Sequence, residues 1–529
     1  MLSLASWVVL LVLLALTSAT VAPPAQRYRP KWESLDTRPV PAWFDEAKVG
    51  ILLHWGRYSV PSFGSEWFWH KWRQDKEPPY VEFMKRNYRP CFTYQDFGSQ
   101  FTAELFDPEK ALGRHLRTVV KGLIAFTFLL LWAGVGWGHH SYETAVRRVA
   151  VARLDVALLD LATGGAGVVV LRAGKARHLG IQYRSGARYV VLTSKHHEGF
   201  ALWPSNMSTN WNSQDVGPNR DLLGDLASAV RRKKGMRFGV FHSLSEWFHP
   251  LYLADKESNF TRARYPQAKA FAELKELVER LIAKLASLCR YHPDLLRIEG
   301  DSEAPASCWN SSSFLAWLYN DSPVRSTVVV NDHWGKDVRC KHGDIFAGCG
   351  VQQKRKWEQY VNLDKSSWGY RREARLEEYY KTAELIDLLV STVSSNGNLL
   401  VNVGPTKEGT ITPAFHERLR DLGRWLSVNG EAVYGSKTWK HQKDAASNVY
   451  YTSKGNNVYA FVLRWPTGEK LHLQSLELSS AGRVTLIGTS DELKWIAENG
   501  NGTEVMFPKL TPDKLPTPWA LVLKVEGAL

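Results

Sequence analysis

Residues 189–203, with the sequence YVVLTSKHHEGFALW, constrain the fold more than any other stretch of this chain. The first four residues form an unbroken apolar and aromatic run, which is typical of a strand buried on both faces of a parallel sheet. The run changes abruptly to titratable residues from Lys195 onward. Such residues at the carboxyl end of a parallel strand favour the mouth of an α/β barrel. The alternative is a solvated loop after an isolated strand.

The same pattern recurs along the chain, in apolar runs that end in polar or aromatic residues at 50–56, 237–243, 293–301 and 398–405. Periodic segments, such as a helix predicted over 267–290, separate these runs. Strands that alternate with helices predict a (β/α)8-like TIM barrel over residues 28–435. From residue 440 to residue 529, short strands separated by turn residues predict a C-terminal antiparallel β-sandwich domain.

Length and charge agree with this organisation. The chain has 529 residues, which is too long for one ordinary core, so two domains are expected. Its net charge is +14, but residues 112–184 contain ten Lys and Arg against three Asp and Glu, which accounts for half of the excess. Because the rest of the chain is only mildly basic, we expect no nucleic-acid partner.

Several features indicate the secretory pathway. Residues 1–22 resemble a signal peptide, with an apolar stretch followed by small residues. Glycosylation sequons begin at five asparagines, namely Asn206, Asn259, Asn310, Asn320 and Asn501. We therefore expect the mature protein in the lysosome or outside the cell. The five cysteines do not form a disulfide framework, although Cys340 and Cys349 are close enough in sequence to close a small loop.

Residues 112–184 differ in character from the rest. Gly122–Gly138 is a run of seventeen uncharged residues, which is the lower limit for a membrane span. Three interpretations remain open: a non-native insertion, a buried or interfacial hairpin, and a real span. We expect no membrane association elsewhere in the chain.

The polar residues at the predicted strand ends suit glycoside hydrolysis better than metal binding. Adjacent histidines on an extended strand point to opposite faces, so His196 and His197 cannot easily chelate one ion. Paired carboxylates between aromatic walls favour a reaction in which one acid protonates the leaving oxygen while the other attacks or activates water. Such a reaction requires no metal and no organic cofactor.

Several long motifs make the chain similar to a known family. The sequence resembles the α-L-fucosidases of glycoside hydrolase family 29, of the animal lysosomal and secreted type, over roughly residues 28–111 and 185–529. The motifs that carry this resemblance are Trp43 to Asp45, His54-Trp55-Gly56, Ser65-Glu66-Trp67, Lys195 to Phe200, Glu246 to Pro250, Phe314 to Asp321, Ser367 to Arg372 and Asn402 to Thr406.

The resemblance implies a retaining mechanism through a covalent fucosyl-enzyme intermediate. It assigns the general acid/base to Glu358 and the nucleophile to Glu299. The residues that it assigns to substrate binding are His54, Glu66, Trp67, His196, His197, Phe241, Trp247 and His333. The implied substrates are glycoproteins, glycolipids or oligosaccharides that carry terminal α-L-fucose. We also expect a homo-oligomer.

The chain departs from the family pattern at three of these places and in the segment 112–184. The family's Trp-Ser-Asp-Gly strand end reads Arg297-Ile298-Glu299-Gly300, so a glutamate replaces the nucleophilic aspartate. A displaced nucleophile can cost on the order of 100-fold in rate. Asp301 could substitute only if the strand end shifted. Phe241 replaces a tyrosine and His333 an arginine. An impaired homologue that binds fucosylated glycans without efficient turnover is therefore the alternative.

Overall fold

The computed structural model describes residues 27–108, 185–284, 287–349, 355–466, 468–489, 491–498, 500–508, 511 and 514–529. The predicted signal peptide at 1–22 lies outside these ranges. The segment 112–184, including Gly122–Gly138, also lies outside them. Among the described helices, none combines the length and the apolar composition that crossing a bilayer requires.

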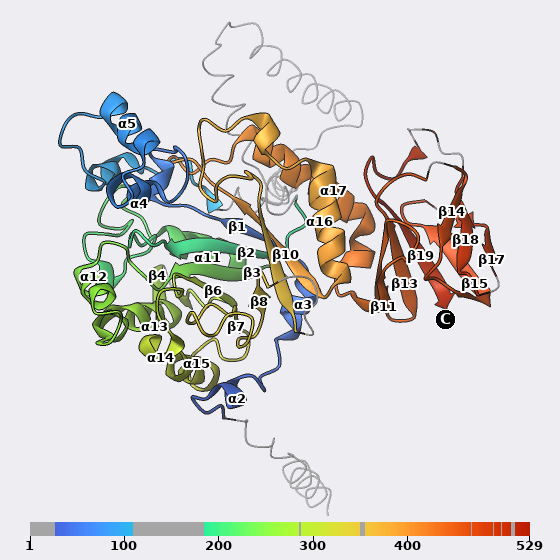
Figure 1. Cartoon of the computed structure of the whole chain (residues 1–529), viewed down its shortest axis with the longest axis horizontal. Helices are drawn as coiled ribbons and strands as arrows, with labels where there is room; N and C mark the ends of the chain where they lie inside the picture. Colours follow the sequence, from blue (N-terminus) through green and yellow to red (C-terminus); the bar gives the residue numbers. More distant parts are fainter. Residues whose placement is uncertain are drawn as a thin grey trace, which may run out of the picture.

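Eight parallel strands form the central sheet (Figure 1). They are β1 (Val49–Leu53), β2 (Tyr189–Lys195), β3 (Arg237–Ser243), β6 (Leu295–Glu299), β7 (Val329–Val330), β8 (Phe346–Ala347), β9 (Trp357–Asn362) and β10 (Gly397–Val403). Their order in the sheet is β7-β6-β3-β2-β1-β10-β9-β8. The backbone N–H of Ile345, next to β8, donates to the carbonyl of Val330 in β7 at 3.1 Å, which joins the two edges into a barrel. The predicted barrel fold is confirmed.

Side chains of the strands alternate between the barrel interior and the surrounding helices. In β1, Leu52 belongs to the interior cluster, whereas Ile51 and Leu53 pack in the outer core. In β2, Val191 likewise points inward. Phe44 precedes β1 and joins the same interior cluster, so it fills the amino end of the barrel. A barrel whose interior is packed with side chains leaves its carboxyl end as the place for a site.

Helices and short turns surround and precede the strands. The α-helices are α2 (Trp32–Leu35), α3 (Ala42–Ala47), α4 (Phe68–Arg73), α5 (Pro78–Asn87), α11 (Leu222–Arg231), α12 (Pro250–Glu257), α13 (Phe271–Glu279), α14 (Ala306–Trp309), α15 (Ser311–Asn320), α16 (Thr382–Ser394) and α17 (Pro413–Val433). A π-helix covers Pro266–Ala270, and 3-10 turns cover Arg57–Ser59, Gln95–Gln100, Asn206–Ser208 and Leu376–Glu378.

The helix predicted over 267–290 is correct only in its first half. The helix α13 ends at Glu279, and the backbone of Arg280 adopts an extended conformation. An antiparallel hairpin of β4 (Leu281–Lys284) and β5 (Ser287–Arg290) follows. An apolar period over ten residues fits a short hairpin as well as a helix, so periodicity alone could not place this boundary.

The C-terminal part consists of antiparallel strands, as predicted. They are β11 (Lys437–Lys443), β12 (Val449–Lys454), β13 (Asn457–Val462), β14 (Lys470–Leu473), β15 (Leu478–Leu486), β16 (Glu492–Leu493), β17 (Trp495–Ala497), β18 (Thr503–Met506) and β19 (Leu521–Ala528). One sheet has the order β11-β12-β13-β19-β15-β16, and the other has the order β14-β18-β17. A separate apolar cluster fills the space between them.

The two parts meet along α16 and α17, which lie between the barrel and the C-terminal sheets (Figure 1). The indole of Trp425 in α17 donates to the carbonyl of Ala520 at 2.7 Å, and the hydroxyl of Thr452 donates to the carbonyl of Ala432 at 2.9 Å. Since α17 ends at Val433 and β11 starts at Lys437, we propose the domain boundary in this connection.

Candidate active site

Five of the predicted site residues follow or end barrel strands. His54 follows β1, His196 and His197 follow β2, Glu299 ends β6, and His333 lies shortly after β7. The carboxyl ends of parallel strands meet at one end of a barrel, so these side chains gather there although they are far apart in sequence.

The imidazoles form a compact buried group. The ring centroid of His196 lies 5.2 Å from that of His54 and 4.6 Å from that of His197. Phe241 contacts His54 at 4.8 Å between centroids. His197 Nδ1 lies 2.5 Å from the hydroxyl of Ser243. Among the described residues, His54 Nε2 and His196 Nδ1 have no hydrogen-bond partner, so both nitrogens are available to a hydroxylated ligand.

These imidazoles are neutral at ordinary pH. Burial lowers the pKa of His54 to about 3 and that of His197 to about 4. Burial also lowers the pKa of His196 well below its ordinary value, and the neighbouring His197 and His54 add to this effect. A neutral imidazole has one donor and one acceptor nitrogen, so the group can match sugar hydroxyls in both roles.

Two tryptophans stand beside the imidazoles. The rings of Trp67 and Trp247 lie 4.8 Å apart, and they lie 5.7 Å and 5.2 Å from His197. The backbone N–H of Trp247 donates to the carbonyl of His197 at 2.9 Å, which fixes its loop to the end of β2. Trp67 is 40% exposed, so its ring offers an apolar face at the rim of the group.

Glu66 connects the loop of Trp67 to a segment near the end of β9. Its Oε2 accepts hydrogen bonds from the hydroxyl of Ser367 at 3.0 Å, from the backbone N–H of Trp368 at 3.0 Å and from that of Gly369 at 3.3 Å. The ring of Trp368 thereby lies 5.6 Å from that of His54. This contact was missed from the sequence, where only the motif containing Trp368 was noticed.

Tyr58 is a second missed neighbour. Its ring stacks on His54 at 5.4 Å and meets His196 at 5.1 Å. Tyr58 lies in the turn that follows the His54-Trp55-Gly56 motif, so its position after β1 was the available signal.

Glu299 lies among three cationic side chains. Its Oε2 is 2.9 Å from His333 Nδ1 and 3.9 Å from an Arg339 nitrogen, and its Oε1 is 3.4 Å from Arg297. Burial alone would raise the carboxyl pKa, but these cations outweigh it and lower the pKa of Glu299 to about 2. The same carboxylate raises the pKa of His333 against the effect of burial. Glu299 is therefore ionised, and its carboxylate favours the protonated form of His333.

Glu358 lies deeper in the barrel. It is the second residue of β9, near the amino end of that strand, and it is fully buried. Arg297 donates to its Oε2 at 2.6 Å, and the hydroxyl of Tyr189 donates to its Oε1 at 2.8 Å. Burial raises the pKa of Glu358, although Arg297 and Tyr189 act in the opposite direction. One guanidinium thus connects the two predicted catalytic carboxylates.

Asp301 holds the loop after β6 in place. It is fully buried, and its oxygens accept from the backbone N–H of Gly335 at 3.0 Å and from Arg339 at 2.9 Å. These bonds tie the loop after β6 to the loop after β7. Asp301 would have to break both of them to reach the position of Glu299.

A disulfide joins the loop after β7 to the segment after β8. Cys340 and Cys349 are bonded to each other, which confirms that they close a small loop. The carboxylate of Asp332, next to His333, accepts from the backbone N–H of Cys340 at 2.7 Å. Asp332 and the two sulfurs lie close enough together to suggest a metal site, but sulfurs in a disulfide provide no thiolate ligand.

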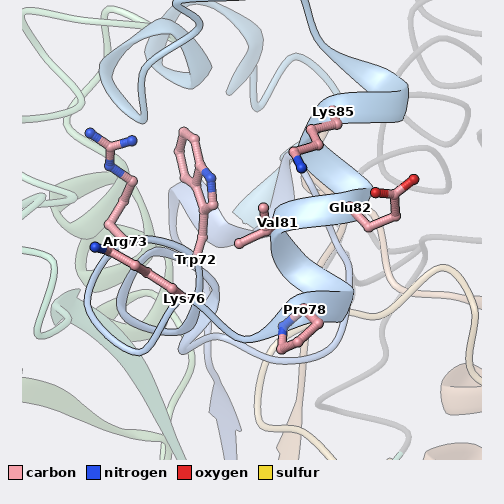
Figure 2. A pocket seen from close by; sticks show the side chains of 7 residues that line it. All are labelled: Trp72, Arg73, Lys76, Pro78, Val81, Glu82 and Lys85. Carbon is pink, nitrogen blue, oxygen red and sulfur yellow. The ribbon is translucent and has the colours of Figure 1, made fainter.

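A cavity of about 890 Å³ lies elsewhere, beside α4 and α5 (Figure 2). It is lined by Trp72, Arg73, Lys76, Pro78, Val81, Glu82 and Lys85. None of the predicted site residues lines this cavity.

Comparison with known proteins assigns the family. The family model described as Alpha-L-fucosidase matches residues 15–113 and 177–431, and the one described as Alpha-L-fucosidase C-terminal domain matches residues 442–526. The chain belongs to the α-L-fucosidase family. This α-L-fucosidase is a glycoside hydrolase, as the resemblance predicted.

Animal relatives match over nearly the whole length. The α-L-fucosidase of Branchiostoma floridae is 44% identical over 98% of this chain and 100% of its own length. The tissue α-L-fucosidase of Homo sapiens is 42% identical over 98% of this chain and 96% of its own, and the human plasma α-L-fucosidase is 43% identical over 96% and 94%.

Solved structures agree with this α-L-fucosidase in fold. The Thermotoga maritima α-fucosidase matches with a TM-score of 0.67 and 31% identity over 94% of this chain and 100% of that chain. The same protein in complex with a mechanism-based inhibitor matches with a TM-score of 0.68, 31% identity and the same coverage.

The neutral imidazoles predict that the enzyme loses stability in acid. In the unfolded chain these groups bind protons below a pKa of about 6.5, whereas the folded state keeps them neutral, so stability falls as the pH drops from 6.5 toward 4. Each imidazole contributes a slope of up to about 1.4 kcal/mol per pH unit. Thermal melting at a series of pH values measures this slope.

The variant His54→Asn should reduce that slope, while His441→Asn, at an exposed position, should leave it unchanged. Equal slopes in His54→Asn and the unmodified enzyme would contradict the interpretation.

Proposed function

We propose that this enzyme removes terminal α-L-fucose from glycoproteins, glycolipids or oligosaccharides by double displacement, with Glu299 as the nucleophile. In the first step a Glu299 oxygen bonds to the anomeric carbon while the glycosidic bond breaks and the leaving oxygen takes a proton. In the second step water, after losing a proton to the acid/base, displaces the glutamate. The net configuration at the anomeric carbon is retained.

The observation that carries this proposal is the environment of Glu299. Its side chain keeps 18% of its surface exposed at the carboxyl end of β6, so a ligand can reach it. The cations around it favour the ionised form that a nucleophile requires. The Thermotoga maritima structure with a mechanism-based inhibitor comes from a relative of the same fold and supports a covalent step.

The surrounding residues support recognition of a deoxyhexose. Within the part of the chain that the structure describes, His54 and His196 each have a buried nitrogen without a hydrogen-bond partner, and these nitrogens can bind the sugar hydroxyls. Trp67 and Trp247 provide an aromatic face, which suits the apolar edge with the C6 methyl group. Phe241, beside His54, offers no hydroxyl and so contributes shape only.

Glu358 is our candidate for the acid/base, on the basis of its position in the Trp357-Glu358 pair. A raised pKa favours this role, because the acid must be protonated before attack. Its bonds to Arg297 and Tyr189 oppose the role. Proton donation by Glu358 therefore requires that Arg297 release it when substrate binds.

The contact between Arg297 and Glu358 favours a second candidate function. If Arg297 holds Glu358 throughout, the protein binds fucosylated glycans without efficient turnover. Labelling of the nucleophile separates the two functions.

We predict that a 2-deoxy-2-fluoro-fucosyl fluoride labels Glu299. The 2-fluoro group slows breakdown of the intermediate, and fluoride leaves without help from an acid, so the labelled enzyme accumulates. Mass mapping of the digested enzyme should place the label on residue 299, and Glu299→Gln should remain unlabelled. Asp301→Asn is the control and should still be labelled at residue 299.

A label on Asp301 would show that Asp301, and not Glu299, is the nucleophile. Retained fucose binding without any label would establish the binding function instead.

We predict that Glu358→Gln distinguishes acid/base catalysis from a purely structural role. Without the acid, turnover of an alkyl fucoside should fall by about 10²–10⁴-fold, whereas a fucoside with a dinitrophenolate leaving group should lose far less in the fucosylation step. Tyr189→Phe, which removes one hydrogen bond but keeps the carboxylate, is the matched control. Equal losses for both fucosides would exclude Glu358 as the acid.

The secretory pathway is our proposal for the location, in the lysosome or outside the cell. The disulfide between Cys340 and Cys349 supports an oxidising compartment. Four of the sequon asparagines, at 206, 259, 310 and 501, are exposed. Asn320 differs, because its side-chain amide accepts from the backbone N–H of Tyr28 at 2.8 Å and donates to the carbonyl of Tyr28 at 2.8 Å.

We predict glycans at the four exposed asparagines and none at Asn320. A glycan on Asn320 would break both bonds to Tyr28, and Pro323 after the sequon also disfavours modification. Mass spectrometry of the secreted protein, with and without endoglycosidase, measures occupancy at each position. A substantial glycan fraction on Asn320 would contradict the prediction.

A further inference from the structure

Three departures from the family pattern meet at Glu299. Arg297, Glu299 and His333 stand where the resemblance to the family implies Trp, Asp and Arg. In the fold, Glu299 lies 3.4 Å from Arg297 and 2.9 Å from His333. Residues that differ together and touch form one unit, so the effect of each exchange depends on the other two.

The strand β6 directs Arg297 and Glu299 to the same side. Residues two apart in a strand share a face, and Leu295 at the start of β6 belongs to the interior cluster. Arg297 is fully buried, and its guanidinium carbon lies 4.5 Å from the centre of the Tyr360 ring. Its two terminal nitrogens point to different carboxylates, Glu358 at 2.6 Å and Glu299 at 3.4 Å. The planar fork of an arginine permits this double contact, which a lysine cannot reproduce.

The second oxygen of Glu299 faces other cations. His333 reaches it from the loop after β7, and Arg339 lies 3.9 Å away. His333 also faces Asp332, at 3.7 Å from its Nε2, and Asp301 acts on it electrostatically.

His54 and His197 complete the surroundings of Glu299, which acts on both of them electrostatically. Because these two imidazoles stay neutral, the cations that act on the carboxylate among the described residues are Arg297, Arg339 and His333.

A glutamate places its carboxylate about one methylene farther from the strand than an aspartate does. An error on the order of 1 Å at a reacting atom can cost about 100-fold in rate. Arg297 pulls one oxygen toward the barrel axis, and His333 holds the other from the side. The longer side chain is thereby fixed rather than free to swing.

We propose that Arg297 is a positioning residue that, together with His333, holds Glu299 in the place where the family's aspartate acts. The proposal rests on Glu299 being the nucleophile. An aspartate at position 299 would lie farther from both Arg297 and His333. We therefore expect Glu299→Asp alone to slow the reaction of this enzyme, although the resemblance implies an aspartate at this position in the family.

The test measures the rate of labelling by a 2-deoxy-2-fluoro-fucosyl fluoride. In the native background, Glu299→Asp should slow labelling at least about tenfold. In the Arg297→Trp/His333→Arg background, which restores the family residues, Glu299→Asp should accelerate labelling relative to the double variant. The expected result is that Glu299→Asp slows labelling in the native background and accelerates it in the double variant. The same fold-change in labelling rate in both backgrounds would overturn the proposal.

The pH dependence of labelling provides a second measurement that a merely structural role would not change. Loss of a cation raises the pKa of a neighbouring carboxyl by about one unit or more, so His333→Asn should move the acid limb of the labelling rate upward. Arg297→Lys keeps a charge but cannot contact both carboxylates, so the loss of its contact with Glu299 should move the acid limb in the same direction. His333→Arg, which stays charged, should remove a basic limb that arises when His333 loses its proton.

Arg38→Met is the matched control. Arg38 is also buried and paired with an aspartate, Asp344, at 2.8 Å, but it lies outside the site. Arg38→Met should lower the melting temperature without moving the acid or the basic limb of the labelling rate. If Arg297→Trp does not fold, Arg297→Lys and His333→Arg decide the question through the limbs alone.

Labelling of the unmodified enzyme distinguishes a wrong nucleophile from a wrong positioning residue. If the unmodified enzyme is not labelled at residue 299, both the nucleophile assignment and the role of Arg297 are wrong. If residue 299 is labelled but the limbs and the effect of Glu299→Asp are independent of residues 297 and 333, only the positioning role is wrong.

Discussion

The interior of the barrel depends on one buried cation that must be neutralised. Burying a guanidinium away from water costs free energy unless carboxylates and hydrogen bonds compensate its charge. Arg297 meets this requirement with Glu358 below and Glu299 above, and Tyr360 covers its face. Removing one partner would leave an uncompensated charge, so the three residues constrain one another. The position of the exposed carboxylate at the mouth therefore depends on a contact deeper in the sheet.

Behind the imidazoles a second group of buried charges stabilises the site from outside the barrel. Lys195, at the end of β2, lies 2.7 Å from Glu246 and 2.5 Å from Glu273. Glu246 directly precedes Trp247, and Glu273 belongs to α13. The aromatic side of the site is thus anchored to a strand and to a helix. Side chains that must keep their geometry when a ligand binds benefit from supports of this kind.

Much of this arrangement could be predicted from the sequence. Apolar runs with polar ends predicted the barrel strands, because the pattern reflects burial on both faces. The ends of those strands supplied His54, His196, His197 and Glu299, since the topology of a parallel barrel brings them together. The end of α13 was misplaced, because an amphipathic segment after Glu279 satisfies the helical period as well as a hairpin does.

The contact between Arg297 and Glu358 could not be predicted in the same way. The two residues lie 61 positions apart on strands that are not neighbours in the sheet. Whether a long side chain crosses the barrel depends on the register of each strand and on the space that the other interior residues leave. From the sequence, Arg297 was only a departure from a pattern. Trp368 and Tyr58 were missed as neighbours of His54 for the same reason, because loops brought them there.

The disulfide after β7 connects the chemistry of the site to the surroundings of the folding chain. Asp332 accepts a hydrogen bond from the backbone of Cys340, and His333 follows directly. The crosslink thus restrains the segment that orients this imidazole toward Glu299. A chain folded where glutathione keeps thiols reduced would lack that restraint. Correct folding of the barrel alone would then leave His333 less restrained, and the geometry around Glu299 would depend on the redox conditions under which the protein matured.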